Sequence, residues 1–296
     1  MHAGVLLVDK PGGMTSHDVV SRARKALGTR KIGHAGTLDP MATGLLILGV
    51  EGATRLLTYL VGLDKTYLAT IRLGAETTTD DAEGEIVATA APERIAAIVD
   101  DAIASGIAAL TGEISQVPST VSAIKVNGRR AYDLARAGEQ VELKAREVTV
   151  SRFEVRQMRR ADDAIELDVV VDCSSGTYIR ALARDLGAGL GIGGHLTALR
   201  RTRIGRFDVD DAIAPDEIDA SRLRGAAEVA ERAVGRIDVS ADEARDLRHG
   251  KRLEGAADRL PGTVAAAIDP DGRLVGIVER RGAALKSAMN MPEGAE

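Results

Sequence analysis

Several stretches of this chain have the apolar pattern of β-strands, and unequal intervals separate them. Residues 4–10 form an apolar run that ends at Pro11, which predicts a buried strand. Residues 65–74 and 164–173 alternate apolar and polar side chains, as half-buried strands do. In the first of these two, one face holds Tyr67, Ala69, Ile71 and Leu73.

Helical patterns fall between these strands without a regular alternation. Residues 15–28 have a capping-box pattern at their start and a glycine at their end, and a long amphipathic helix is expected over residues 92–112. A turn is expected at Asn127-Gly128, followed by a short helix. A further helix has the core stripe Ile179, Leu182, Ala183 and Leu186. A doubly wound sheet requires alternating strands and helices, so the order favours an α+β fold.

The length and the change of texture after residue 210 predict two domains. The chain has 296 residues, more than one hydrophobic core usually serves, and 45% of them are hydrophobic. Beyond residue 210 the sequence becomes helical and acidic, with a capping box over residues 240–243 and a hairpin pattern around residues 270–272. We therefore expect a large domain at residues 1–235 and a small one at residues 236–296.

Cysteine, histidine and hydropathy patterns narrow the protein class. Cys173 is the single cysteine, which excludes an internal disulfide and a cysteine-cluster metal site. The five histidines show no metal-ligand spacing, and no run of 18 apolar residues occurs. We expect a protein of the reducing cytoplasm that binds no metal and does not span a membrane.

The charge is unevenly distributed. A net charge of −5 argues weakly against a polyanionic partner, but the acidic excess lies after residue 207. Two stretches, residues 22–31 and 195–207, contain basic side chains and no acidic one. Their basic residues are Arg22, Arg24, Lys25, Arg30 and Lys31, and Arg200, Arg201, Arg203 and Arg206. Each patch fits contacts to nucleic-acid phosphates, and a solvated basic face explains either patch equally well.

Residues 33–49 place a histidine and a carboxylate among glycines in one loop. Asp39 precedes Pro40, and an Asp-Pro pair is most often a turn or a helix cap without chemistry. The segment lacks the GK[ST] of a phosphate-binding loop, and the chain shows no second acid in register and no G-x-S-x-G nucleophile motif. If the loop is catalytic, a lone nucleophilic or basic aspartate is what remains.

Six motifs, in order, resemble the TruB family of bacterial tRNA pseudouridine synthases, and among them the actinobacterial type. They lie at residues 4–20, 33–49, 65–84, 122–138, 173–187 and 193–207. The resemblance implies a pseudouridine-synthase fold, which is a mixed, mostly antiparallel sheet flanked by helices. It also implies that residues 236–296 form a small, β-rich, PUA-like RNA-binding domain and that residues 1–235 form the catalytic domain.

The resemblance further implies that Asp39 is the catalytic aspartate, with Arg180 as its arginine partner. Tyr67 corresponds to the tyrosine that stacks on the target base, and it is a candidate for taking the proton from C5 of the uracil. Without the motifs, Arg180 would be interpreted as a helix-surface arginine and Tyr67 as a core tyrosine.

Other residues are assigned to substrate binding by the same resemblance. Tyr178 and Leu199 would line the pocket, and His34 would help to fill the space that a flipped nucleotide leaves. The expected backbone contacts are Lys10, Lys65, Lys125, Arg200 and Arg201. Where family members often have P-P-x-Y-S-A, this chain has P-S-T-V-S-A at residues 118–123. Val121 stands where the pattern has tyrosine, so one aromatic contact or packing residue is absent.

Two functions of different classes are compatible with these motifs. The first is an isomerase that converts uridine 55 of the tRNA TΨC loop to pseudouridine, with no cofactor and no obligate protein partner, and as a monomer. The second is a tRNA-binding folding chaperone whose catalysis is dispensable. Attack at C6 of the uracil and attack at C1′ of the ribose both remain open for Asp39. A protein-binding domain with incidental basic patches is a third possibility.

Overall fold

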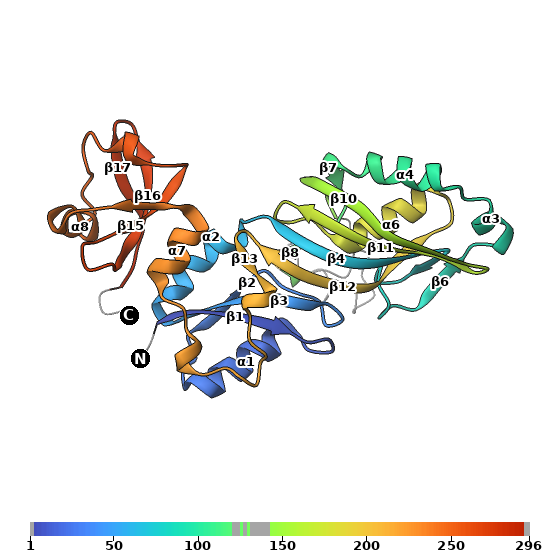
Figure 1. The fold of residues 1–296 in the computed structure, drawn as a ribbon, viewed down its shortest axis with the longest axis horizontal. Helices are drawn as coiled ribbons and strands as arrows, with labels where there is room; N and C mark the ends of the chain where they lie inside the picture. Colours follow the sequence, from blue (N-terminus) through green and yellow to red (C-terminus); the bar gives the residue numbers. More distant parts are fainter. Residues whose placement is uncertain (1–2, 120–124, 127–128, 131–142, 293–296) are drawn as a thin grey trace. The chain divides into compact units, whose positions relative to one another are not determined.

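The computed structural model describes residues 3–119, 125–126, 129–130 and 143–292. The chain divides into two compact units, each of which contains both strands and helices (Figure 1). Unit 1 is built from Met1–Leu38, Gly44–Leu63 and Gly205–Glu296, and unit 2 from Asp39–Thr43 and Asp64–Ile204. The α+β class expected from the order of the segments is confirmed.

Unit 2 is organised around an antiparallel sheet with the strand order β12-β4-β11-β10-β7. The strands are β4 (Lys65–Leu73), β7 (Gly112–Gln116), β10 (Arg146–Ala161), β11 (Ala164–Cys173) and β12 (Gly194–Ile204). The alternation predicted for β4 is present, because every second side chain from Tyr67 to Leu73 is buried. Two small hairpins accompany the sheet: β5 (Ala75–Thr77) with β6 (Ile86–Thr89), and β8 (Lys125–Val126) with β9 (Arg129–Arg130).

Helices cover one face of this sheet. Helix α6 (Ile179–Gly189) packs on β12 and β4, and α4 (Asp100–Ala109) packs against α6 and β10 (Figure 1). The predicted stripe of α6 is buried in full, namely Ile179, Leu182, Ala183 and Leu186. Burial of this stripe fixes the rotation of α6, and so fixes the direction in which the residues of its first turn point.

The prediction of a single long helix over residues 92–112 is wrong. Two helices occupy this stretch, α3 (Pro92–Ala96) and α4, and Val99 between them is extended with ψ 157°. Asp100 and Asp101 follow at once, and carboxylates are favourable in the first turn of a helix. The turn expected at Asn127-Gly128 and the helix after it lie outside the described residues.

The first part of unit 1 combines three antiparallel strands with helix α1. Strand β3 (Thr43–Val50) pairs with β1 (Gly4–Lys10) and with β2 (Ile32–Ala35). Helix α1 (Ser16–Leu27) has the predicted capping box, and Gly28 ends it with φ 65° in the left-handed region. The short helices η1 (Glu51–Leu56) and α2 (Leu57–Val61) follow.

The C-terminal part of unit 1 builds a second small sheet in the order β14-β15-β16-β17. Its strands are β14 (Arg236–Asp238), β15 (Val264–Ile268), β16 (Leu274–Arg281) and β17 (Ala284–Asn290). The remaining elements are β13 (Phe207–Asp208), η2 (Val209–Asp211), η3 (Ala220–Arg222), α7 (Ala226–Val234), α8 (Ala241–Arg248) and η4 (Ala257–Arg259). The capping box of α8 and the hairpin between β15 and β16 are both confirmed.

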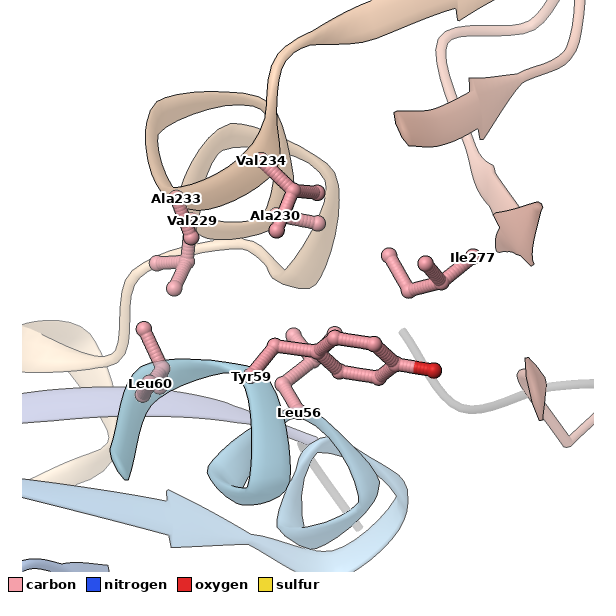
Figure 2. A pocket seen from close by; sticks show the side chains of 8 residues that line it. All are labelled: Leu56, Tyr59, Leu60, Val229, Ala230, Ala233, Val234 and Ile277. Atoms are coloured by element: carbon pink, nitrogen blue, oxygen red, sulfur yellow. The ribbon is translucent and has the colours of Figure 1, made fainter. Parts of the chain in front are cut away.

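An apolar seam in unit 1 joins α2, α7 and the small sheet. Tyr59 and Leu60 of α2 face the side chains of α7, and Ile277 of β16 completes the lining (Figure 2). Burial, together with the nearby Glu279 carboxylate, raises the pKa of Tyr59. Arg55 adds a polar contact by donating to the carbonyl of Asn290 at 2.5 Å.

Within the described residues, no helix is long and apolar enough to span a membrane.

Two glycines allow α6 to approach β12 closely. A Cβ atom on Gly187 would lie 2.2 Å from the carbonyl carbon of Gly193, and a Cβ atom on Gly194 would lie 2.6 Å from the carbonyl oxygen of Ala183. Backbone atoms occupy both positions, so neither clash is relieved by a rotamer change. Glycine is therefore required where the helix meets the strand.

We predict that Gly187→Ala lowers the free energy of unfolding by about 1–3 kcal/mol, because the added methyl group forces α6 away from β12. Urea unfolding of the purified protein measures this loss. Gly189→Ala is the matched control, since a Cβ atom there meets nothing within 4 Å, and it should be neutral or stabilise by up to about 1 kcal/mol. Equal stability of the two variants would contradict the close approach.

Candidate active site

Asp39 forms an ion pair with Arg180, which lies in the first turn of α6. The distance from Asp39 Oδ2 to Arg180 Nη2 is 3.1 Å, and the Asp39 and Arg180 side chains are 36% and 4% exposed. The Ala42 N–H donates to the Asp39 carbonyl at 3.1 Å, so the backbone of the Asp-Pro pair also forms a local turn. A buried guanidinium thus holds an accessible carboxylate, and a fixed positive charge favours the ionised form.

Arg180 contacts a second carboxylate, that of Asp81. Its Nη1 lies 3.3 Å from Asp81 Oδ2 and donates to the carbonyl of Thr79 at 2.9 Å. The Asp81 side chain is only 3% exposed, and it accepts hydrogen bonds from the Thr79 hydroxyl and from the Glu83 N–H. The buried Asp81 carboxylate therefore helps to orient the Arg180 guanidinium, which also pairs with Asp39.

Asp81 is the residue of this site that sequence reasoning missed. The motif at residues 65–84 includes it, but nothing in the sequence assigns a role to its carboxylate. The backbone places the two neighbouring aspartates differently, because Asp80 has φ 61° and pairs with Arg184 at 3.2 Å. Only the three-dimensional course of this turn shows which carboxylate reaches Arg180.

The N-terminus of α6 is held by Gln116, at the end of β7. The Gln116 side-chain amide donates to the Tyr178 carbonyl at 3.1 Å and accepts from the Tyr178 N–H at 2.8 Å. Tyr178 is the N-cap residue of α6 and makes no side-chain cap of its own. Since Arg180 follows two residues later, these two hydrogen bonds also fix the start of the helix that bears the guanidinium.

Tyr67 lies in β4 and is 8% exposed. Burial raises its pKa above the ordinary value for a phenol, while Arg201 acts in the opposite direction through its charge and a hydrogen bond. The Asp39 carboxylate is close enough to contribute to the same increase. The phenol is therefore neutral at physiological pH, and the charges of Arg201 and Asp39 both act on it.

Lys65 and Arg201, two of the expected phosphate contacts, are buried near this tyrosine. Lys65 is 6% exposed, and burial together with the charge of Arg201 lowers its pKa to about 8. Cys173, which pairs with Lys65 across β11 and β4, has a pKa raised by burial to about 11. Because Lys65 and Arg201 are both buried, little of either side chain is available to a phosphate at the protein surface.

Leu199 and Arg200 line an open groove of about 650 Å³ in unit 2. Arg200 Nη1 donates to the Thr43 hydroxyl at 3.4 Å, which links β12 to the segment that begins with Asp39. Further lining side chains come from Met41, Leu68, Thr70, Arg156, Asp168 and Ala198. Apolar and hydroxyl side chains line the groove together with three charged ones, Arg156, Arg200 and Asp168.

The remaining predicted residues lie in other parts of the chain. In unit 1, His34 of β2 makes an edge-to-face contact with His17 at 5.7 Å between ring centroids. Lys10 is buried and donates to the carbonyls of Pro11 (3.0 Å) and Met14 (2.5 Å). Lys125 belongs to the short strand β8 of unit 2. The roles assigned to these three residues stay predictions.

The basic patch of residues 22–31 covers the second half of α1 and the loop after it. Its five basic side chains are exposed, and Arg24 donates to the Ile32 carbonyl at 3.2 Å. In the part of the chain that the structure describes, no three His, Cys, Asp or Glu side chains are grouped as a metal site would require.

Three family models match consecutive parts of the chain. The model described as TruB family pseudouridylate synthase (N terminal domain) matches residues 24–179. The tRNA pseudouridylate synthase B C-terminal domain matches residues 180–238, and the model tRNA pseudouridine synthase II, C terminal, matches residues 235–292. The matched ranges include Asp39, Tyr67, Asp81 and Arg180.

Individual relatives agree with the family models. The tRNA pseudouridine synthase B of Leifsonia xyli subsp. xyli (strain CTCB07) is 59% identical over 292 residues, which cover 98% of this chain and 97% of that protein. The protein of the same name from Nocardia farcinica (strain IFM 10152) is 58% identical over 281 residues, which cover 94% of this chain and 90% of that protein.

Solved structures show the same fold at lower identity. An H/ACA RNP bound to a substrate RNA containing 2′-deoxyuridine includes a chain with a TM-score of 0.70 and 24% identity, covering 99% of this chain and 86% of that chain. A Cbf5-Nop10-Gar1 complex gives a TM-score of 0.70 at 23% identity, with coverages of 98% and 84%. Together with the family models, these likenesses show the mixed α+β pseudouridine-synthase fold. Because one family model spans more than half of the sequence and a relative is 59% identical along nearly all of it, the chain belongs to the TruB family of pseudouridylate synthases.

Proposed function

We propose that this isomerase converts uridine 55 in the TΨC loop of tRNA to pseudouridine, with Asp39 as the attacking carboxylate. The ion pair between Asp39 and the buried Arg180 is the observation that most supports this role. The relatives that match nearly the whole chain are named tRNA pseudouridine synthase B, which supports tRNA as the substrate.

The reaction needs an ionised carboxylate and no redox step. The bond from C1′ of the ribose to N1 of the uracil breaks and a bond from C1′ to C5 forms. C5 loses its proton and N1 gains one, so the product has the formula of the substrate. Asp39 would add either to C6 of the uracil or to C1′ as the base departs, and both routes start from the carboxylate. Arg180, held by Asp81, supports that ionised state when the RNA base displaces water from the site.

Base flipping accounts for the other assigned side chains. The target uridine lies inside a folded loop, so it must leave the stack before Asp39 can reach it. Tyr67 would stack on the extruded base, Tyr178 and Leu199 would line its pocket, and His34 would occupy the space left in the RNA.

Contacts to the RNA backbone would come from exposed basic side chains. The patch of residues 22–31, in α1 and the loop after it, is the favoured surface, with Arg200 at the groove. We assign catalysis to residues 1–235 and propose residues 236–296 as a PUA-like RNA-binding domain.

Asp39→Asn should lower turnover at least about a thousandfold, because the amide removes the nucleophile but keeps its shape. Tritium release from a T-arm stem-loop that contains 5-tritiated uridine measures this, with Asp163→Asn as the control because its side chain is 74% exposed. Retained activity in Asp39→Asn would overturn the assignment. An inactive wild-type protein that still binds and refolds tRNA would favour the chaperone function.

Asp81→Asn should lower kcat by about tenfold to a hundredfold and leave KM for tRNA nearly unchanged. The substitution removes the buried charge that orients Arg180 but leaves the RNA-binding surface intact. Steady-state kinetics on full-length tRNA distinguishes the two parameters. A rise in KM with an unchanged kcat would indicate that Asp81 acts on binding instead.

Removing two charges from α1, with Arg22→Ala and Lys25→Ala together, should weaken tRNA binding and reduce the salt dependence of log Kd by about 1–2. Filter binding between low and moderate salt gives this slope. The matched control removes two arginines from β10, Arg159→Ala with Arg160→Ala, whose side chains already pair with Asp168 and Asp100. A slope that changes equally in both double variants would exclude α1 as a specific contact.

A further inference from the structure

Arg184 lies one helical turn after Arg180 on α6 and reaches the same turn of the chain. Residues four apart lie on one side of a helix, so the two guanidiniums can bind neighbouring acceptors. Arg180 pairs with Asp81, and Arg184 Nη1 lies 3.2 Å from Asp80 Oδ2. Two consecutive aspartates are thus held by two arginines of one helix. The first pair supports Asp39, whereas the proposed function gives the second pair no role.

The backbone of Asp80 makes this double contact possible. Side chains of consecutive residues in an extended chain point to opposite sides. Asp80 instead has φ 61°, in the left-handed region that residues other than glycine seldom adopt, although aspartate and asparagine tolerate it better than most. Its carbonyl accepts from the Leu196 N–H at 3.0 Å, which ties the bend to β12. A backbone conformation of this kind persists only where surrounding contacts hold it.

Each nitrogen of the Arg184 guanidinium has an acceptor. Besides the contact of Nη1 with Asp80, Nη2 donates to the Val117 carbonyl at 2.7 Å, and Nε donates to Asp185 Oδ1 at 2.9 Å. The three acceptors belong to the turn between β5 and β6, to the residue after β7, and to α6 itself. The side chains of Arg184 and Asp80 are 28% and 16% exposed, so water screens this pair less than an ordinary surface ion pair. Arg184 is therefore held in one orientation, in which it anchors Asp80.

The turn that Arg184 anchors also carries the acceptors of Arg180. One is the Thr79 carbonyl, 2.9 Å from Arg180 Nη1, and the other is the Asp81 carboxylate, 3.3 Å from the same nitrogen. Asp80 is the residue between these two acceptors in the sequence. A displacement of Asp80 would therefore move both acceptors of Arg180 together.

We propose that Asp80 and Arg184 form a positioning pair. Their contact holds residues 79–81 against α6, and through these residues it holds the Arg180 guanidinium beside Asp39. This inference rests on the proposed function, in which Asp39 attacks the RNA. Neither member of the pair contacts the uridine in this role. The pair keeps Arg180 in place as the uridine enters, and a displacement of a catalytic group by about 1 Å can cost about a hundredfold in rate.

Replacing Asp80 by asparagine tests this role. Asp80→Asn removes the charge but keeps the shape of the side chain, and asparagine tolerates a positive φ. In steady-state tritium release it should lower kcat about fivefold to fiftyfold and change KM for full-length tRNA less than about twofold.

The pH profile of kcat separates positioning from a loss of stability. The acid limb of the Asp80→Asn profile should move to higher pH, because the Asp39 carboxylate loses part of the positive charge that favours its ionised form. A variant with less folded protein but an intact site would instead keep the wild-type acid limb.

A double-mutant cycle shows whether the two residues act as a pair. Arg184→Gln should lower kcat about as much as Asp80→Asn, and the double variant should be within about twofold of either single variant. Arg184→Lys keeps a cation opposite Asp80, so its kcat should lie between those of wild type and Arg184→Gln. This advantage of lysine should vanish in the Asp80→Asn background. Arg184→Lys also provides the comparison if Arg184→Gln does not fold.

Asp185→Asn is the matched control. It removes another carboxylate from the same guanidinium, but Asp185 belongs to α6 and does not connect the helix to the turn. Its kcat and its pH profile should equal those of wild type.

A wild-type kcat and an unshifted acid limb in Asp80→Asn would overturn the positioning role and leave the proposed function intact. Losses that multiply in the double variant, or an equal loss in Asp185→Asn, would do the same. An inactive wild-type protein would instead overturn the proposed function, and with it this role.

Discussion

One guanidinium shared by two carboxylates is the interaction on which the site depends. Arg180 lies between the accessible Asp39 and the buried Asp81, and each carboxylate comes from a segment far from α6 in the sequence. If Arg180 were lost, Asp81 would remain as a buried charge with its main cation removed, which costs several kcal/mol in typical proteins, about 3–5. Two other residues of unit 2 help to place α6, which bears this side chain. Gln116 fixes the start of α6, and Gly187 sets the distance of its end from β12.

Local structure was largely predictable because it depends on short-range chemistry. The capping boxes at the starts of α1 and α8 and the stripe of α6 follow from residue types at fixed spacing, and all three are present. The sequence did not predict the break at Val99, because the apolar periodicity continues through this residue although the helical backbone is interrupted there. The pairing of Asp39 with Arg180 came from resemblance to a family, because no local pattern links residues so far apart.

The burial of Lys65 could have been predicted from the sequence, whereas the burial of Arg201 could not. Lys65 has the same parity as Tyr67 and Ala69 in β4, so the alternation already placed it on the buried face. Arg201 could not be placed in this way. The register of β12 against β4 shifts between Leu196 and Ala198 and again between Arg201 and Arg203, and each irregularity changes which side chains face inward.

The short segment Asp39–Thr43 has a consequence for how this protein can be divided. It belongs to unit 2, although the chain on both sides of it, Met1–Leu38 and Gly44–Leu63, belongs to unit 1. A fragment that starts at Asp64 would retain Arg180, Asp81 and Tyr67 but would lack the Asp39 carboxylate. No single uninterrupted piece of unit 2 contains the whole set. Any recombination, permutation or fusion that separates the two units along the sequence therefore has to transfer the segment Asp39–Thr43 on its own.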